Sequence, residues 1–164
     1  MHLPPPLAAA INRAPLPLVQ AVIDRVFRRV LLQHPDLFER LGPFASRHFS
    51  FSPTDLDLAF VVEPAVPAIR VYRPRQLPAV HAGVAGPLLT LLALLEGRID
   101  GDAVFFSRSL SVTGDMEAVL ALRNALDDCG FDLPRDLSGL AGPFAPPLRR
   151  AGEMLRERAL AGWA

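Results

Sequence analysis

The segment PLLTLLALLEG, residues 87–97, constrains the fold of this chain most strongly. It has the start and stop signals of a helix, with Pro87 in the first turn and Gly97 at the end. The segment is apolar on nearly every side, so we expect this helix to be buried on most of its surface. It is also far too short to cross a bilayer, which takes ~20 residues.

Alternating apolar and polar residues predict the strands that would cover this helix. They occupy residues 46–52, 56–63, 68–73, 79–86 and 108–113. The short connections between the first four favour antiparallel neighbours. Helices are predicted over residues 18–33, 36–41, 115–128 and 148–160, whereas the proline-rich residues 1–17 and 132–147 are expected to be irregular. We therefore predict an α+β fold, with an antiparallel or mixed five-stranded sheet backed by helices.

The chain divides into three parts by composition. Residues 1–39 hold a Pro-rich segment and an amphipathic helix, residues 40–131 a central domain, and residues 132–164 a linker and a C-terminal helix. The net charge is zero, with basic ends and an acidic middle, so nothing indicates a nucleic-acid-binding protein. The single cysteine, Cys129, fits a reducing compartment and is expected to be an inert, buried thiol. Without an evident signal peptide, we expect a cytoplasmic protein, at most peripheral to the inner membrane.

Catalytic motifs are not evident in this sequence. None of the histidines, His2, His34, His48 and His81, stands at metal-ligand spacing from another ligand, so neither a metal nor a cofactor is predicted. Turn chemistry explains the carboxylate pairs Asp55 with Asp57 and Asp100 with Asp102. An enzyme that uses His81 or His48 on a hydrophobic substrate remains an alternative.

The stretch SRSLSVTGDMEAV, residues 107–119, places hydroxyls and two acids where a strand turns into a helix. Acids at a helix start repel an incoming anion, so we interpret Asp115 and Glu117 as helix-capping and dipole-compensating residues rather than as a phosphate site. Thr113, Gly114 or Asp115 could be the N-cap. The helix that follows has an apolar face of Met116, Val119, Leu120, Leu122 and Leu126, near which Arg123 and Asp127 could pair.

The large apolar residues of the strands and of helix 87–97 have two interpretations. They form either an ordinary core or the wall of an apolar cavity between sheet and helix, and the pattern alone favours the core. If there is a cavity, the candidate lining residues are Phe49, Phe51, Phe60, Val62, Ile69, Val71, Leu88, Leu91, Leu92, Leu95, Phe105, Phe106, Leu110 and Val112.

Residues 87–126 resemble the sterol carrier protein type 2 domain family. The family's Leu-rich helix corresponds to Leu91, Leu92, Leu94, Leu95 and Gly97, and its acidic loop to Asp100 and Asp102. Its strand and helix start correspond to Arg108, Leu110, Val112, Gly114 and Asp115, after the segment Ala103 to Phe106. This resemblance covers roughly residues 40–130 and implies a non-catalytic lipid carrier with an apolar cavity.

Residues 105–128 are similar to one bacterial branch of that family, the UbiT accessory factors of ubiquinone biosynthesis. This resemblance implies a role in oxygen-independent, anaerobic ubiquinone synthesis. The implied cargo is an isoprenoid quinone, a ubiquinone precursor or phospholipid, and the implied protein partners are hydroxylation proteins of the UbiU and UbiV type. A homodimer and a generic lipid carrier or scaffold remain open alternatives.

The helix over residues 18–33 has the pattern of a helix that lies on a membrane surface. Its wide apolar face consists of Leu18, Val19, Val22, Ile23, Val26, Phe27 and Val30. Gln20, Asp24, Arg25 and Arg28 lie opposite, with Arg29 at the margin, and a wide apolar face beside arginines is typical of an interfacial helix. The candidate membrane contacts are Val22, Arg25, Val26, Arg28 and Arg29. The other interpretation, which is equally compatible with the pattern, is that this helix covers the sheet or a dimer interface.

Overall fold

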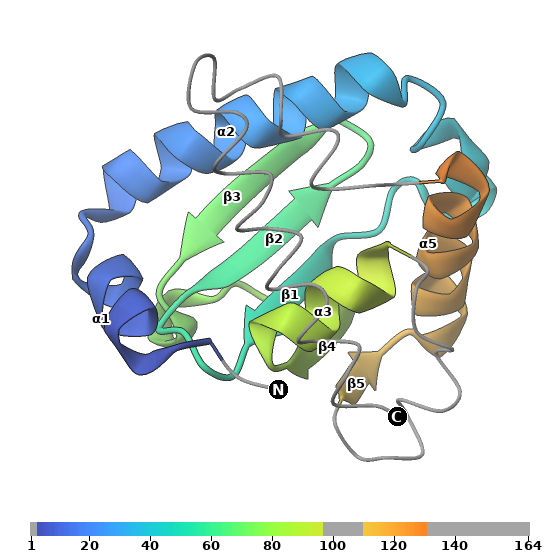
Figure 1. The fold of residues 1–164 in the computed structure, drawn as a ribbon. Coiled ribbons are helices and arrows are strands. Elements are labelled where there is room, and N and C mark those ends of the chain that lie inside the picture. Colours follow the sequence, from blue (N-terminus) through green and yellow to red (C-terminus); the bar gives the residue numbers. More distant parts are fainter. Residues whose placement is uncertain (1–2, 97–109, 131–164) are drawn as a thin grey trace, which may run out of the picture.

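The computed structural model describes residues 3–96 and 110–130, and a five-stranded sheet lies at their centre (Figure 1). The strands are β1 (Phe49–Pro53), β2 (Ala59–Glu63), β3 (Ala68–Tyr72), β4 (Ala82–Gly86) and β5 (Ser111–Gly114). Their spatial order is β3-β2-β1-β4-β5. The central pair β1 and β4 is parallel and the other neighbours are antiparallel. The predicted α+β fold with a mixed sheet is confirmed.

The first two short connections join antiparallel neighbours, as expected, but the third does not. β4 follows β3 in the sequence but pairs with β1, with Phe49 opposite Ala82. Because β3 and β4 run in the same direction on opposite sides of β2 and β1, residues 73–81 must cross the sheet. This crossing includes a short 3-10 turn, η2 (Pro74–Gln76), and it delays the start of β4 from the expected residue 79 to Ala82.

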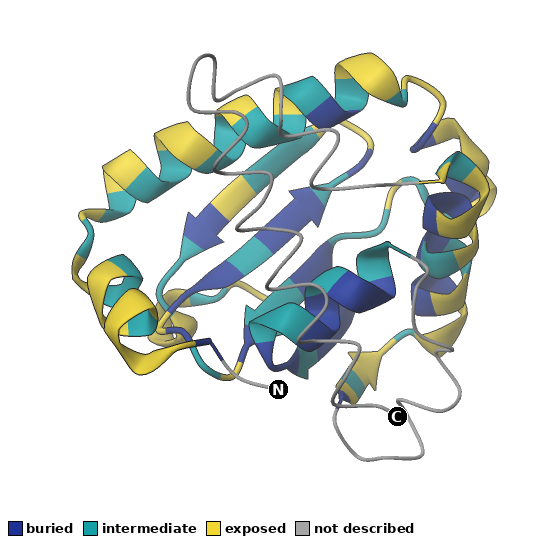
Figure 2. Ribbon diagram, in the orientation of Figure 1, coloured by how far each residue is buried: buried dark blue, intermediate teal, exposed yellow. Residues whose placement is uncertain are grey.

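Three of the predicted helices are confirmed and lie on one face of the sheet (Figure 1). They are α2 (Leu16–Gln33), α3 (Leu88–Leu95) and α5 (Met116–Cys129). The main core forms where α3 and α5 meet the strands: Phe49, Val62 and Val84 from the sheet share a buried cluster with Leu91 and Leu122. Figure 2 shows buried residues on α3 and on the inward side of α5, whereas much of α2 is exposed.

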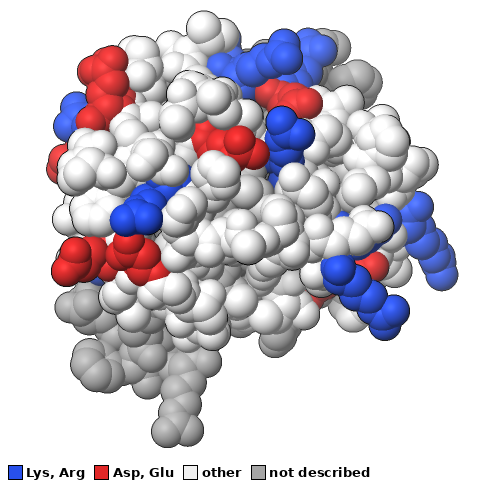
Figure 3. Space-filling model, turned by 180° about the vertical axis from the view of Figure 1, so that it is seen from behind, with Lys and Arg blue, Asp and Glu red and all other residues white. Residues whose placement is uncertain are grey.

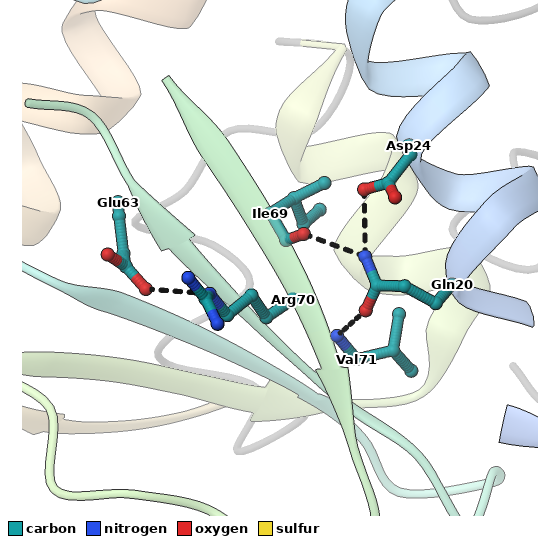
Figure 4. A network of polar contacts seen from close by, with 6 residues as sticks. All are labelled: Gln20, Asp24, Glu63, Ile69, Arg70 and Val71. Carbon is teal, nitrogen blue, oxygen red and sulfur yellow. Dashed lines mark hydrogen bonds and ion pairs between the residues drawn. The ribbon is translucent and has the colours of Figure 1, made fainter. Parts of the chain in front are cut away.

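α2 packs along β3, which is an edge strand, through hydrogen bonds from Gln20 (Figure 4). The Gln20 side-chain amide donates to the carbonyl oxygen of Ile69 at 2.9 Å and accepts from the N–H of Val71 at 2.7 Å. It also donates to Asp24 Oδ1 at 2.8 Å. The amide therefore takes the place of the peptide group of a missing neighbouring strand, and it satisfies backbone groups that an open edge leaves unpaired.

This contact corrects the predicted orientation of α2. Gln20 and Asp24, assigned to the outer face, lie toward the sheet edge, while Leu18 and Val22 of the apolar face are 58% and 55% exposed. Val19, Ile23 and Phe27 do pack against the core clusters, as expected. The hydrogen bonds between Gln20 and β3 therefore favour a helix orientation that differs from the one its hydrophobic pattern predicts.

The expectation that residues 1–17 are irregular is wrong, because α1 (Pro5–Arg13) lies within them. Proline in the first turn of a helix costs no hydrogen bond, and the alanines that follow favour helix strongly. The segment is anchored by its polar groups: the Leu3 N–H donates to Asp55 Oδ2 at 2.8 Å, and Asn12 Oδ1 accepts from the Asp57 N–H at 2.8 Å.

The predicted short helix over residues 36–41 is wrong in its position and type. A turn at residues 35–38 leads into the 3-10 segment η1 (Glu39–Phe44), which runs past Gly42 and Pro43. Gly42 has a φ of 52°, a left-handed conformation that interrupts this segment and that glycine adopts without strain. The start of the last strand at residues 108–109, the linker at 132–147 and the helix at 148–160 lie outside the described residues.

Candidate functional site

The corner between β5 and α5 begins with a tight turn and a capped helix. Gly114 has a φ of 79°, and a Cβ there would collide with the carbonyl oxygen of His81. The Asp115 side chain accepts a hydrogen bond from the Ala118 N–H at 3.0 Å, which identifies it as the N-cap of α5. Arg47 lies 3.7 Å from the second oxygen of Asp115. Asp115 therefore caps α5, and both of its carboxylate oxygens have partners. This agrees with the interpretation of the stretch as a helix start.

An apolar cavity of about 220 Å³ lies between α5, α3 and the sheet. Its walls come from β1, β4, the end of α3 and one long side of α5. The lining residues are Phe51, Val84, Leu94, Leu95, Met116, Val119, Leu120, Leu122, Arg123 and Leu126. Because Met116 and Leu120 are 58% and 54% exposed, the cavity opens to the surface beside them.

Arg123 is the charged residue in this lining. Its Nε lies 3.6 Å from Asp127 Oδ2, one helical turn further along α5, which confirms the predicted pair. The side chain of Arg123 is 24% exposed and that of Asp127 38%. The cavity is therefore apolar over most of its surface and has one paired cation in its wall.

Asp55 positions α3, the helix that supplies Leu94 and Leu95 to the cavity. Its Oδ1 accepts a hydrogen bond from the Leu88 N–H at 2.9 Å, at the start of α3, while Oδ2 holds Leu3. The residue before α3 is Pro87, which provides no side-chain cap, so Asp55 supplies the cap from a distant turn. Asp57 lies 3.7 Å from Arg73 instead. The Asp55 and Asp57 carboxylates thus have separate structural roles.

Only some of the predicted lining residues line the cavity. Phe51 and Leu95 line the cavity. A second set belongs to the surrounding core, either buried in it or packed against it: Phe49, Val62, Ile69, Leu91, Leu110 and Val112. Phe60, Val71 and Leu88 belong to another cluster, next to the N-terminal segment. Leu92 is half-buried outside the lining, and Phe105 and Phe106 lie outside the described residues.

Most of the remaining wall comes from α5. The sequence identifies the apolar face of this helix, including Met116, Val119 and Leu120, but as a packing surface. The sequence also places Arg123 at the margin of that apolar face. Val84 and Leu94 follow the strand and helix periodicities and are missing only from the predicted lining. Periodicity reports that a face is turned inward, and it does not report whether the facing layers leave space between them.

His48 and His81 are tied to each other at the start of β1 and β4. The His48 N–H donates to His81 Nδ1 at 3.0 Å, and the rings stand perpendicular with their centroids 5.4 Å apart. The His81 carbonyl accepts from the Asp115 N–H at 2.9 Å. Neither histidine is among the residues that line the cavity. These contacts join the sheet crossing to the start of α5, which is a structural role.

The described residues contain no group of three or more His, Cys, Asp or Glu side chains that could hold a metal ion.

Burial raises the pKa of the Cys129 thiol, and Arg40 lowers it in part. The raised pKa keeps this thiol protonated near neutral pH. Cys129 is half-buried, whereas the sequence predicted a buried thiol. On the face of the molecule seen in Figure 3, basic and acidic side chains are interspersed and most of the surface is uncharged.

The candidate membrane contacts on α2 differ in their exposure. Val22, Arg25 and Arg28 are exposed, whereas Val26 and Arg29 are half-buried. Near the end of the helix, Leu32 is 78% exposed. None of the helices in residues 3–96 and 110–130 has the length and hydrophobicity needed to cross a bilayer.

The chain belongs to the SCP-2 sterol transfer family, whose model matches residues 24–127. Among solved structures, it is similar to one described as "UbiJ-SCP2 Ubiquinone synthesis protein", with 20% sequence identity and a TM-score of 0.57 over 73% of this chain and 98% of that one. Sterol carrier protein 2 from Yarrowia lipolytica has 16% identity and a TM-score of 0.48, over 70% of this chain and 94% of that one. No curated protein matches the chain in sequence. At 20% identity, the match to the UbiJ-SCP2 structure establishes a shared fold.

Proposed function

We propose that this protein is a lipid-binding accessory factor that holds the apolar part of its cargo in the cavity between α3, α5 and the sheet. The observation that carries the proposal is this cavity, because its lining is apolar apart from Arg123. Its place in the SCP-2 sterol transfer family supports the same function. An apolar site with few polar groups binds by removing hydrocarbon surface from water.

The cavity volume indicates the size of the group that its walls surround. Ligand pockets for drug-sized molecules typically measure ~300–1,000 Å³, whereas a cavity of ~150 Å³ holds a single benzene ring. At about 220 Å³, this cavity accommodates a ring with a short substituent or part of a chain. The exposed Met116 and Leu120 offer an apolar exit, so we propose that a longer tail leaves the cavity between them.

We propose further that the cargo is an isoprenoid quinone, a ubiquinone precursor or phospholipid, and that the protein acts in oxygen-independent ubiquinone synthesis. Two likenesses support this pathway. Residues 105–128 resemble the UbiT accessory factors, and the similar solved structure is described as a ubiquinone synthesis protein. Hydroxylation proteins of the UbiU and UbiV type are the proposed partners.

Mass spectrometry of lipid extracted from the native full-length protein tests the binding function. Leu95→Trp fills the cavity and should remove the bound lipid, whereas Leu92→Trp, on the same helix but outside the lining, should keep it. If extracts of the unaltered protein contain neither quinone nor lipid, the proposal is wrong.

Deleting the gene tests the anaerobic role. The deletion should abolish ubiquinone production without oxygen and leave it intact with oxygen, whereas an equal loss in both conditions would contradict this role.

We propose that α2 also contacts a membrane surface. Its outer side combines exposed apolar residues with the arginines 25 and 28, and each arginine near an anionic leaflet contributes about 1 kcal/mol. Replacing Arg25 and Arg28 with Glu should therefore reduce co-sedimentation with anionic liposomes. The exposed Arg75→Glu on η2 is the matched control and should not. Equal binding by all three proteins would exclude α2 as the contact.

The proposed function assigns no catalytic role to His48 or His81. Replacing both with Gln should preserve bound lipid and quinone production in cells, provided that the thermal midpoint shows a folded variant. Loss of quinone production from a folded variant that still holds lipid would instead favour the enzyme alternative.

A further inference from the structure

We propose, on the basis of the lipid-binding function, that the cavity takes the end of a hydrocarbon chain, and that the oxygen-bearing ring or head group of the cargo stays outside, beyond Met116 and Leu120. At about 220 Å³, the cavity has room for a small ring or for part of a chain. These two occupants differ in polarity, because the ring of a quinone precursor carries oxygens and the end of an isoprenoid chain carries none. The polar groups around the cavity therefore decide between them.

Among the residues that the structure describes, those lining the inner part of the cavity carry no side-chain hydrogen-bond donor. Five lining residues are between 5% and 8% exposed, and all are aliphatic: Val84, Leu94, Val119, Leu122 and Leu126. The backbone is occupied as well, because β1 and β4 are paired and the N–H groups of α5 after its first turn bond within the helix. A ring oxygen placed here would lose its hydrogen bonds to water and gain none.

Arg123 does not supply the missing donor. Its Nε pairs with Asp127 Oδ2 at 3.6 Å, and the residue has a further interaction besides this one. Its side chain is 24% exposed, so it borders the cavity on the solvent side. A ring oxygen at Arg123 would have to displace an existing partner, and a neutral oxygen is a weaker acceptor than a carboxylate. The ring therefore gains little by entering the cavity on this side.

The loss of hydration offsets much of what a ring gains by burial. An oxygen that leaves water without a new hydrogen bond weakens binding by roughly 5–150-fold. Each buried CH₂ group strengthens binding by about 4-fold. A ring with two or more oxygens has this loss several times over, whereas the end of an isoprenoid chain has none. The chain end is therefore the favoured occupant.

The mouth of the cavity suits a chain that passes through it. Met116 and Leu120 lie one turn apart on α5, line the cavity and are 58% and 54% exposed. Both are apolar, and the flexible methionine side chain adapts to an irregular chain. They would cover the part of the chain that leaves the cavity, with the ring in solvent beyond them. An enzyme that modifies the ring could then reach it while the chain stays bound.

Three probes test the orientation by isothermal titration calorimetry with the full-length protein. Geraniol is a chain of two isoprene units without a ring, dimethoxymethylbenzoquinone is a ring without a chain, and the third probe carries that ring on two isoprene units. A cavity of ~150 Å³ holds the six carbons of benzene, so about 220 Å³ corresponds to roughly nine carbons, close to two isoprene units. Geraniol and the two-unit quinone should bind within ~3-fold of each other, and the ring alone at least ~10-fold more weakly.

The opposite order of affinities would show that the ring occupies the cavity. If the ring alone binds as tightly as the two-unit quinone and geraniol does not bind, the proposed orientation is wrong and the lipid-binding function stands. Failure of the unaltered protein to bind any of the three probes would instead contradict the lipid-binding function itself.

Photo-crosslinking of the two-unit quinone locates both of its ends in the full-length protein. A diazirine at the chain end should label the buried lining, such as Leu94 or Leu122, whereas a diazirine on the ring should not, as measured by peptide mass spectrometry. Leu95→Trp should abolish the chain-end label, and Leu92→Trp, on the same helix but outside the lining, should keep it. Ring labels in the buried lining of the unaltered protein would overturn the orientation. The thermal midpoint of each variant confirms that it is folded.

Discussion

α3 and α2 lie on the same face of the sheet and are held there in opposite ways. α3 has eight residues, of which Thr90, Leu91, Ala93 and Leu94 are buried. α2 has eighteen residues and buries only Val30 fully, yet its Gln20 makes two hydrogen bonds to the backbone of β3. The short helix is held by the exclusion of water. The long one is held in part by completing the hydrogen bonds of a sheet edge.

The two helices therefore have different roles. α3 contributes to the cavity wall, and its inner side chains cannot be changed without disturbing the core. The outer side of α2 carries little of the packing and is available for a surface role. Four substitutions test whether α3 and α2 are attached to the sheet in these different ways.

Leu91→Ala should lower the free energy of unfolding by about 2–5 kcal/mol. Leu91 is 3% exposed in the main core, and its truncation leaves a void that α3 cannot close. Chemical denaturation measures the change, and Leu92→Ala, on the half-buried side of the same helix, should cost clearly less. Equal costs would mean that α3 is not anchored by one buried side.

Gln20→Leu should lower the free energy of unfolding by about 1–3 kcal/mol, although it increases the hydrophobicity of α2. It leaves the Ile69 carbonyl and the Val71 N–H without their side-chain partner. Hydrogen exchange should show faster exchange at Val71. Gln33→Leu, at the exposed end of α2, is the control. A Gln20→Leu variant as stable as the original would show that α2 is held by its apolar contacts alone.

Asp55→Ala should cost about 1–2 kcal/mol, because α3 loses the acceptor at its first N–H and the N-terminal segment loses an anchor. The effect should appear both in thermal denaturation and as faster proteolysis near Leu3. Asp57→Ala, two residues away in an exposed ion pair, should cost less than half as much. A larger loss from Asp57 would reverse the roles assigned to these two acids.

Val22→Ser should change the free energy of unfolding by no more than ~0.5 kcal/mol, since Val22 is 55% exposed on the outer side of α2. Ile23→Ser, the next residue but packed against a core cluster, should be clearly destabilising. Urea denaturation of both variants measures the contrast. If Val22→Ser destabilised as much as Ile23→Ser, the outer side of α2 would be part of the fold and not a free surface.

Two predictions that involve residues close in sequence are confirmed by the structure, although those of an irregular segment at residues 1–17 and of a helix at 36–41 are wrong. Asp115, one of three candidates for the N-cap, caps α5, and Arg123 pairs with Asp127. Both contacts involve residues three or four apart, so their geometry follows from the helix itself. Gln20 could not be assigned in this way. Its partners lie 49 and 51 residues away and are available only because β3 is the edge of the sheet.

The cavity illustrates the same limit. Phe51 and Phe49 alternate in one strand and point to the same face of the sheet, yet Phe51 lines the cavity and Phe49 is 1% exposed in the core. Nothing in their pattern separates the two residues. The distinction depends on how closely α3 and α5 approach the sheet at each level, which is a property of the packed layers.

Sequence pattern alone missed α1 and the side of α2 that faces the sheet, but it predicted the strands, the apolar helix α3, the start of α5 and the amphipathic character of α2. These follow from backbone periodicity and short-range hydrogen bonding. The pairing of β4 with β1, the hydrogen bonds of Gln20 to the β3 edge and the space beside α5 depend on tertiary packing. Strand order and the gaps between layers arise when segments distant in sequence compete to bury the same surfaces and to pair the same backbone groups.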